Sequence, residues 1–132
     1  MPAECERLVW SHRVEGPALV LGSTQPHETV AAETSSKAEV LRRRSGGGAV
    51  LVQSYDTWID VLIGHDDDLW DNDVGKAFGW LGRVWARTFT ALGIQCAVHE
   101  GGLVEREAGR VVCFAGLGPG EVSRVDGTKL LG

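Results

Sequence analysis

Residues 39–53 read EVLRRRSGGGAVLVQ, and this stretch sets the expected fold around it. The segments on either side of its glycines, 39–44 and 49–53, carry apolar side chains typical of strands. Three consecutive glycines sustain neither a helix nor a strand well, so residues 45–48 are expected to form a loop. In an extended first segment Arg42 and Arg44 share one face and Arg43 points to the other. The stretch therefore predicts two strands joined by a glycine loop.

A glycine loop flanked by arginines has a definite chemical use. Glycines lack a Cβ, so their backbone N–H groups can come close to an anion. The forked donors of a guanidinium suit a phosphate or a carboxylate. The spacing matches neither the P-loop nor the dinucleotide-binding glycine pattern. The alternative interpretation is a hairpin tip with solvated arginines.

Outside this stretch, turn residues divide the chain into further short elements. Apolar runs predict strands at 17–22, 57–63, 94–99 and 111–115. A polar segment, 23–38, is expected to be a loop with one short helix near 28–34. Residues 122–131 predict a hairpin, because Asp126-Gly127 is a type I′ turn signal.

One segment has the period of a helix. Its apolar side chains are spaced by three and four residues, which places them on one helical face: Val74, Phe78, Leu81, Trp85, Phe89 and Leu92. The acidic residues at 66–73 precede it, where carboxylates cap free N–H groups and oppose the positive end of the helix dipole. Gly93 suits the position just after the helix. We expect one long amphipathic helix here, with the acidic run as its solvated start and not a calcium loop.

These elements predict an α/β protein of the α+β type, with mixed, largely antiparallel sheets and one long helix. The 132 residues are expected to form a single domain, 1–132. Hydrophobic residues make up 43 % of the chain and charged residues 23 %, which excludes disordered, collagen-like and coiled-coil classes. No apolar run approaches the roughly 20 residues of a membrane helix. The first residues lack a signal-peptide pattern, so we expect a cytoplasmic protein without a membrane partner.

The net charge and the cysteine content limit the classes of partner and of metal site that we expect for the chain. Thirteen Lys and Arg against eighteen Asp and Glu give a net charge of −5, which disfavours nucleic-acid binding. A nucleic-acid interface on the basic residues 42–44 is the weakest alternative. Cys5, Cys96 and Cys113 fit neither a disulfide framework nor a zinc site. The four histidines have no metal-ligand spacing either, so no metal site is expected on the protein itself.

Several motifs together resemble the lipoate–protein ligases, whose superfamily also includes octanoyltransferases and biotin–protein ligases. RRRSGGGAV at 42–50 resembles the family's glycine-loop signature, and ALVLGSTQ at 18–25 resembles the strand-Gly-x-x-Gln element before it. GTKLLG at 127–132 resembles the element that carries the catalytic lysine. Cys113-Phe114 and, further on, Gly120-Glu121-Val122 resemble the segment before that lysine. The resemblance covers roughly residues 8–132 and implies the fold of the biotin/lipoate ligase catalytic domain.

The resemblance implies a ligase that attaches lipoate, octanoate or a related acyl group to a lysine of a carrier. The acyl carboxylate attacks the α-phosphate of ATP, and the acyl-adenylate then reacts with the lysine of a lipoyl-acceptor domain or a glycine cleavage H-type carrier protein. ATP with Mg²⁺ is the implied cofactor. Lys129 is the implied catalytic residue. The implied substrate- and nucleotide-binding residues are Arg42, Arg43, Ser45, Gly46, Gly47 and Gly48.

The chain also departs from the family pattern. Many ligases carry His and Asp shortly after the glycines, where this chain has Val52 and Gln53. Relatives continue past the lysine motif, so the resemblance predicts an incomplete, truncated domain that ends at Gly132. Two alternatives follow from the resemblance. One is an octanoyl or lipoyl transferase that uses Cys113 as a thioester nucleophile, without ATP. The other is a non-catalytic relative that binds only a ligand or a partner.

Overall fold

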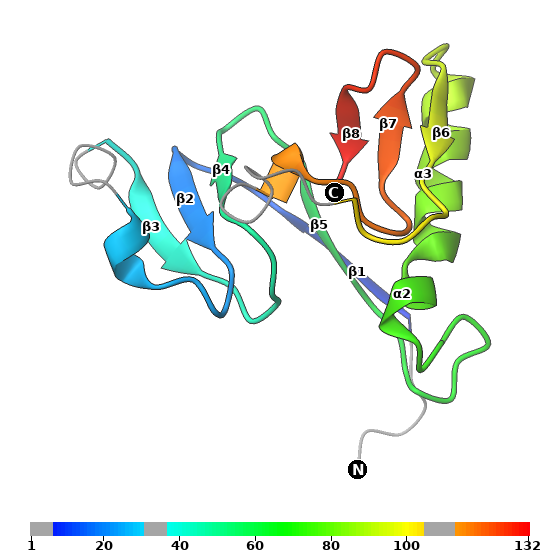
Figure 1. Ribbon diagram of the computed structural model, residues 1–132, viewed down its shortest axis with the longest axis horizontal. Coiled ribbons are helices and arrows are strands. Elements are labelled where there is room, and N and C mark those ends of the chain that lie inside the picture. The colour runs from blue at the N-terminus through cyan, green and yellow to red at the C-terminus, as the bar shows by residue number, and fades with distance from the viewer. Residues whose placement is uncertain (1–6, 31–36, 105–112) are drawn as a thin grey trace. The chain divides into compact units, whose positions relative to one another are not determined.

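The computed structural model describes residues 7–30, 37–104 and 113–132, and these fall into two compact units (Figure 1). One unit contains residues 8–30, 37–62 and 113–115 and is called the glycine-loop unit. The other contains Arg7, 63–104 and 116–132 and is called the helix unit. Both combine short strands with helical segments. The expected mixed α/β class is therefore present, with mostly antiparallel sheets and one long helix.

The centre of the glycine-loop unit is a three-stranded sheet with the order β3-β2-β4. Strand β2 (Ala18–Leu21) pairs in parallel with β3 (Glu39–Arg42) and antiparallel with β4 (Val50–Val52). Its interior is anchored by Leu21, 2 % exposed, and Val52, 4 % exposed. Because β3 and β4 flank β2, the glycine segment between them crosses the end of β2. The hairpin-tip alternative is thus wrong.

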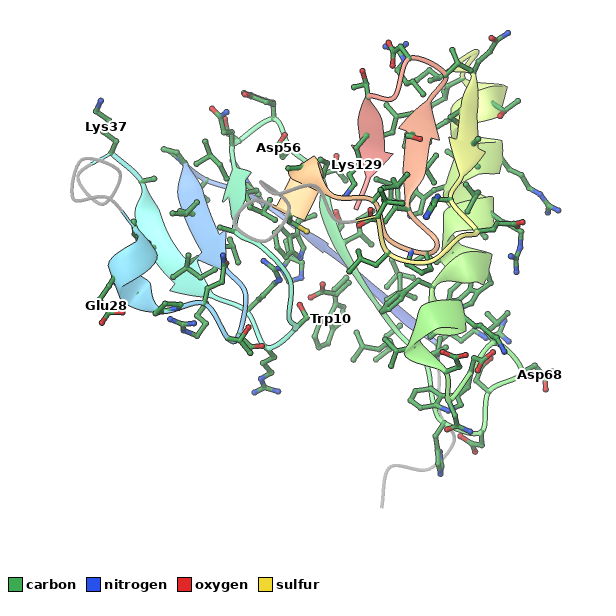
Figure 2. The ribbon with its side chains drawn as sticks, viewed as in Figure 1. Trp10, Glu28, Lys37, Asp56, Asp68 and Lys129 are labelled. Atoms are coloured by element: carbon green, nitrogen blue, oxygen red, sulfur yellow. The ribbon has the colours of Figure 1, made fainter. Side chains whose placement is uncertain are left out.

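A second, two-stranded sheet completes the strands of this unit. Strand β1 (Leu8–His12), which carries Trp10 (Figure 2), pairs antiparallel with β5 (Trp58–Leu62). In this register Trp10 lies opposite Asp60. The predicted strand at 57–63 is confirmed, whereas no element was predicted for β1. Two short 3₁₀ helices also belong here, η1 (His27–Thr29) and η3 (Cys113–Ala115).

The segment at η3 was predicted to be extended. Cys113, Phe114 and Ala115 instead form a helical turn, and Val111 and Val112 lie outside the described residues. The apolar character of this short run suited either conformation, because hydrophobic periodicity does not separate short buried helices from strands. That part of the strand prediction is therefore wrong.

The helix unit places α3 (Gly79–Ala91) against the sheet β6-β7-β8 (Figure 1). Strands β6 (Cys96–Val98), β7 (Val122–Arg124) and β8 (Lys129–Leu131) are antiparallel neighbours. Val122 at 0 % exposure is the buried centre. Gly82 of α3 is also buried, and a Cβ there would lie 2.1 Å from the Gly120 carbonyl oxygen. The helix can approach the sheet this closely because residue 82 has no side chain.

The predicted single helix is divided in two. A four-residue helix, α2 (Val74–Ala77), precedes α3, and Phe78 between them is a turn residue with φ −94° and ψ −8°, still in the right-handed helical region. Glycines at 75 and 79 weaken the helix at this point. The acidic cap is confirmed, since Asp73 Oδ1 accepts from the Gly75 N–H at 2.9 Å. The two ends of the predicted apolar face, Val74 and Phe78 on one side and Leu92 on the other, are exposed. Its middle part is half-buried.

The C-terminal hairpin exists but turns differently from the prediction. The Gly127 N–H donates to the Arg124 carbonyl and the Arg124 N–H donates to the Thr128 carbonyl, at 3.0 and 2.8 Å. With Gly127 at φ +86°, this pattern is that of a three-residue hairpin loop and not of a two-residue type I′ turn. Among the residues described, no helix is both long and apolar enough to cross a membrane.

Candidate functional site

The glycine loop after β3 packs directly on the turn after β2. The Ser23 N–H donates to the Ser45 carbonyl at 2.9 Å, which ties the turn to the loop. A Cβ on Gly22 would lie only 2.0 Å from the Gly47 carbonyl oxygen, so the two backbones are in contact. Gly47 itself has φ +95°, a conformation that favours glycine. Both positions therefore require glycine for this loop to exist in its present form.

Arg43 holds the loop from inside. Its Nη2 donates to the carbonyls of Gly46 and Gly48, each at 2.8 Å, while Nε donates to Ser45 Oγ at 3.1 Å. Its Nη1 donates to the Val20 carbonyl on β2 at 3.2 Å. One guanidinium thus connects the central strand with both ends of the triple glycine. Arg43 and Ser45 act on the shape of the loop, because they bind the protein's own backbone and each other.

Arg42 plays a corresponding part at the neighbouring turn. Its Nη1 donates to the carbonyls of Gly22, Ser23 and Gln25. The Gln25 side chain closes the same turn, because its Oε1 accepts from the Gly22 N–H at 3.0 Å. The contacts of Arg42 and Gln25 give the Gly-x-x-Gln pattern a structural role, which is to close this turn. The exposed Arg44 has no such contact within the described residues.

The backbone N–H groups of the loop are its chemically available part. In a planar trans peptide the N–H points away from the carbonyl of the preceding residue. The carbonyls of Ser45, Gly46 and Gly47 are turned toward Ser23, Arg43 and Gly22, so the next N–H groups point away from those partners. No hydrogen bond to the N–H of Gly46, Gly47 or Gly48 is formed within the described part of the chain. Gly46 and Gly47 are exposed and Gly48 is buried, so the N–H groups of Gly46 and Gly47 are left for an anion.

Cys113 lies beside this loop, at the start of η3. Its N–H donates to the Ala49 carbonyl at 3.0 Å, and its Sγ would be 3.9 Å from a Cβ placed on Gly47. Cys113 is partly exposed, and both described cysteines, Cys96 and Cys113, are outside any disulfide. The structure therefore brings the predicted nucleophile and the predicted glycine loop together in one unit. Sequence separation had hidden this proximity.

Lys129 belongs to the helix unit, on β8 (Figure 2). Its side chain is 6 % exposed, and Nζ lies 2.7 Å from Glu121 Oε2. The same oxygen accepts from the Gly118 N–H at 2.6 Å. In the sequence Glu121 is part of the Gly120-Glu121-Val122 motif, and its contact with Lys129 was not predicted. The seven residues between them contain the hairpin turn, and that hairpin signal could have suggested the pairing.

The donor chemistry bears on nucleotides and metals in different ways. Open backbone N–H groups suit phosphate oxygens as well as carboxylates. Among the residues described, no group of three or more His, Cys, Asp or Glu side chains is placed to hold a metal ion. Val52, at a position where many ligases carry a polar residue, is 4 % exposed and points into the sheet core.

The chain was compared with protein-family models, curated proteins and solved structures, and nothing matched.

Proposed function

We propose that the glycine loop binds the carboxyl end of an acyl group, and that the chain acts as an acyl ligase of the lipoate–protein ligase kind. The observation that carries this proposal is the pair of N–H groups on the exposed residues Gly46 and Gly47, which have no hydrogen-bond partner among the described residues. Arg43 holds the loop in shape without using these donors. Such a prearranged set stabilises oxyanions without reorganisation.

In the proposed reaction the carboxylate of lipoate or octanoate attacks the α-phosphate of ATP and pyrophosphate leaves. The carrier lysine, as a free amine, then attacks the carbonyl of the acyl-adenylate. An amide forms and AMP leaves. The loop N–H groups would bind the oxygens that gain negative charge in both steps. The resemblance to the lipoate–protein ligases, and not the arrangement of the two units, assigns to Lys129 the positive charge for the carboxylate and the adenylate phosphate, with Mg²⁺ carried by ATP.

A second candidate is an acyl transferase, favoured by the position of Cys113 beside Gly47. The Cys113 thiolate would attack the carbonyl of an acyl-carrier thioester, and the carrier thiol would leave. The amine of the acceptor lysine would then displace Cys113 and regenerate its thiol. The same glycine N–H groups would stabilise the tetrahedral oxyanion in each step. ATP has no part in this reaction.

The two candidates separate in one experiment. The protein is incubated with octanoate, ATP, Mg²⁺ and a lipoyl-acceptor domain, or with octanoyl-acyl-carrier protein and the same acceptor without ATP. Intact-mass analysis follows the acceptor. Octanoylation in the first mixture, lost in Lys129→Met and kept in the exposed control Lys76→Met, supports the ligase. Octanoylation in the second, lost in Cys113→Ala and kept in Cys96→Ala, supports the transferase.

A negative result in both mixtures rejects both enzymes. Calorimetry with a non-hydrolysable octanoyl-adenylate analogue then tests binding alone. Saturable binding without turnover would identify a non-catalytic ligand-binding chain. An absence of binding would reject the glycine loop as an acyl site altogether.

A further inference from the structure

The helix unit contains a buried cation that is held by an internal carboxylate. Lys129 Nζ, on a side chain 6 % exposed, lies 2.7 Å from Glu121 Oε2. Gly132 covers the lysine, since a Cβ at residue 132 would be 3.0 Å from Nζ. A lysine buried to this extent needs an anionic or polar partner, because desolvation disfavours its charge. Glu121 supplies that anion.

The backbone adds a second donor at the same point. Gly118-Pro119-Gly120-Glu121 forms a turn closed by the Glu121 N–H and the Gly118 carbonyl at 3.2 Å, with Gly120 at φ +83°. Pro at the second and Gly at the third position are typical of a type II turn. The turn directs the Gly118 N–H at Glu121 Oε2, 2.6 Å away. One ammonium and one amide thus converge on a single carboxylate oxygen.

We propose that Lys129 Nζ and the Gly118 N–H form a carboxylate-binding site, and that Glu121 occupies it as an internal ligand which an external carboxylate displaces. The proposed function uses Lys129 for a substrate carboxylate, and on that function this inference rests for its physiological ligand. It adds the competitor that such a substrate must replace. Glu121 is a positioning residue in this scheme, because it acts only through Lys129.

Two structural features favour the replacement of Glu121 by an external carboxylate. An incoming carboxylate offers Nζ and the Gly118 N–H the same charge-assisted hydrogen bonds that Glu121 offers. The Glu121 side chain is 20 % exposed, so its carboxylate can rotate into solvent without crossing the core. Because the buried Lys129 charge requires an anionic partner, the site opens only when an external carboxylate takes the place of Glu121.

The test is a titration of the whole chain with sodium acetate, against sodium chloride at equal ionic strength. The Gly118 amide is followed by ¹H–¹⁵N NMR, and affinity is obtained from the saturating shift. In Glu121→Ala we expect acetate to bind at least about tenfold more tightly than in the wild type, because the competing carboxylate is gone. Glu100→Ala removes an exposed glutamate of the same unit and is expected to behave as the wild type.

Two variants complete the test. Lys129→Met removes the cation and is expected to abolish the saturable Gly118 shift. Glu121→Gln keeps an acceptor for Gly118 and nearly the same volume, so it preserves folding if Glu121→Ala does not, and it is expected to bind acetate more tightly than the wild type. Equal acetate affinity in the wild type and in whichever Glu121 variant folds overturns the proposal. A response that chloride reproduces also overturns it.

The outcome is distinguishable from that of the acyl-transfer assay. Acetate binding that depends on Glu121 and Lys129, in a chain that transfers no acyl group, retains this site and rejects the proposed function. Acyl transfer without any difference in acetate affinity between the wild type and the Glu121 variants rejects this site alone.

Discussion

Arg43 is the residue on which the glycine loop depends most, and its removal is the sharpest test of the site. Its guanidinium donates to Gly46 O and Gly48 O at 2.8 Å each, and to Val20 O at 3.2 Å. In Arg43→Ala the three carbonyls lose a charged donor. A hydrogen bond to a charged group contributes roughly 1.5–3 kcal/mol, and the lower value applies because Arg43 is only half-buried. The two short bonds alone then correspond to about 3 kcal/mol.

The measurement is urea unfolding of the wild type and of three variants, followed by circular dichroism and by amide hydrogen exchange at Val20 and Val50. With a slope of about 1.5 kcal/mol per molar urea, the loss in Arg43→Ala lowers the midpoint by about 2 M. Arg43→Lys keeps the charge but not the planar fork, so it is expected to recover less than half of the loss. Arg44→Ala is the matched control, with a change below about 0.5 kcal/mol.

The comparison between neighbouring arginines can refute the reasoning directly. The unfolding free energies of Arg43→Ala and Arg44→Ala are compared, and about 0.5 kcal/mol is the resolution of such experiments. If the two values agree within that limit, the four contacts of Arg43 do not organise the loop. The expected order of stability is wild type and Arg44→Ala, then Arg43→Lys, then Arg43→Ala. The same order is expected for octanoyl-adenylate affinity, because binding requires the loop to keep its shape.

Three further perturbations follow from the packing and the charges. Gly22→Ala puts a Cβ 2.0 Å from Gly47 O and is expected to lose about 2–4 kcal/mol of unfolding free energy in urea, whereas Gly46→Ala, with nothing within 4 Å, stays within about 1 kcal/mol. Gly120 has φ +83°, and a Cβ there would lie only 2.7 Å from Phe78 O. Gly120→Ala is therefore expected to lower the thermal midpoint far more than Gly127→Ala, because Gly127 also has a positive φ but has open space around it. Equal losses in the two variants would contradict the steric argument. The Arg7 guanidinium, bonded to Asp67 at 2.7 Å, holds the pKa of that carboxyl below its ordinary 3.8, so ¹³C NMR titration should find a higher pKa in Arg7→Ala. Because the folded pKa is lowered, the pair's contribution to stability is present above about pH 4 and is lost as the pH falls through the folded value; an unchanged titration in Arg7→Ala would refute the pairing.

Much of the local structure could be predicted because it depends on neighbours in the sequence. The loop at 45–48, the strands around it, the acidic cap at Asp73 and the positive φ of Gly93 all follow from residue preferences. The division of the helix at Phe78 and the wider hairpin turn at Gly127 were missed. The helix divides beside the glycines at 75 and 79, and the wider turn places Gly127 at φ +86° as the third loop residue.

The candidate site also combines features that follow from the local sequence with features that depend on the tertiary structure. That Arg42, Arg43 and three glycines belong to one anion-binding loop is a local inference. That Arg43 uses its donors on Val20, Gly46 and Gly48 depends on β2 lying between β3 and β4. The approach of Cys113 to Gly47 likewise joins residues far apart in the sequence. No periodicity or spacing encodes such contacts.

The sequence by itself determined the strands around the glycine loop, the loop itself and which residues offer donors, because these properties come from side-chain size, backbone freedom and charge. The tertiary structure alone decided how those donors are used. It turned both arginines onto backbone carbonyls, left the N–H groups of the exposed Gly46 and Gly47 available, and paired Lys129 with Glu121. The reason is physical: a buried or partly buried polar group takes the nearest partner in space, and only the packed chain determines which partner that is.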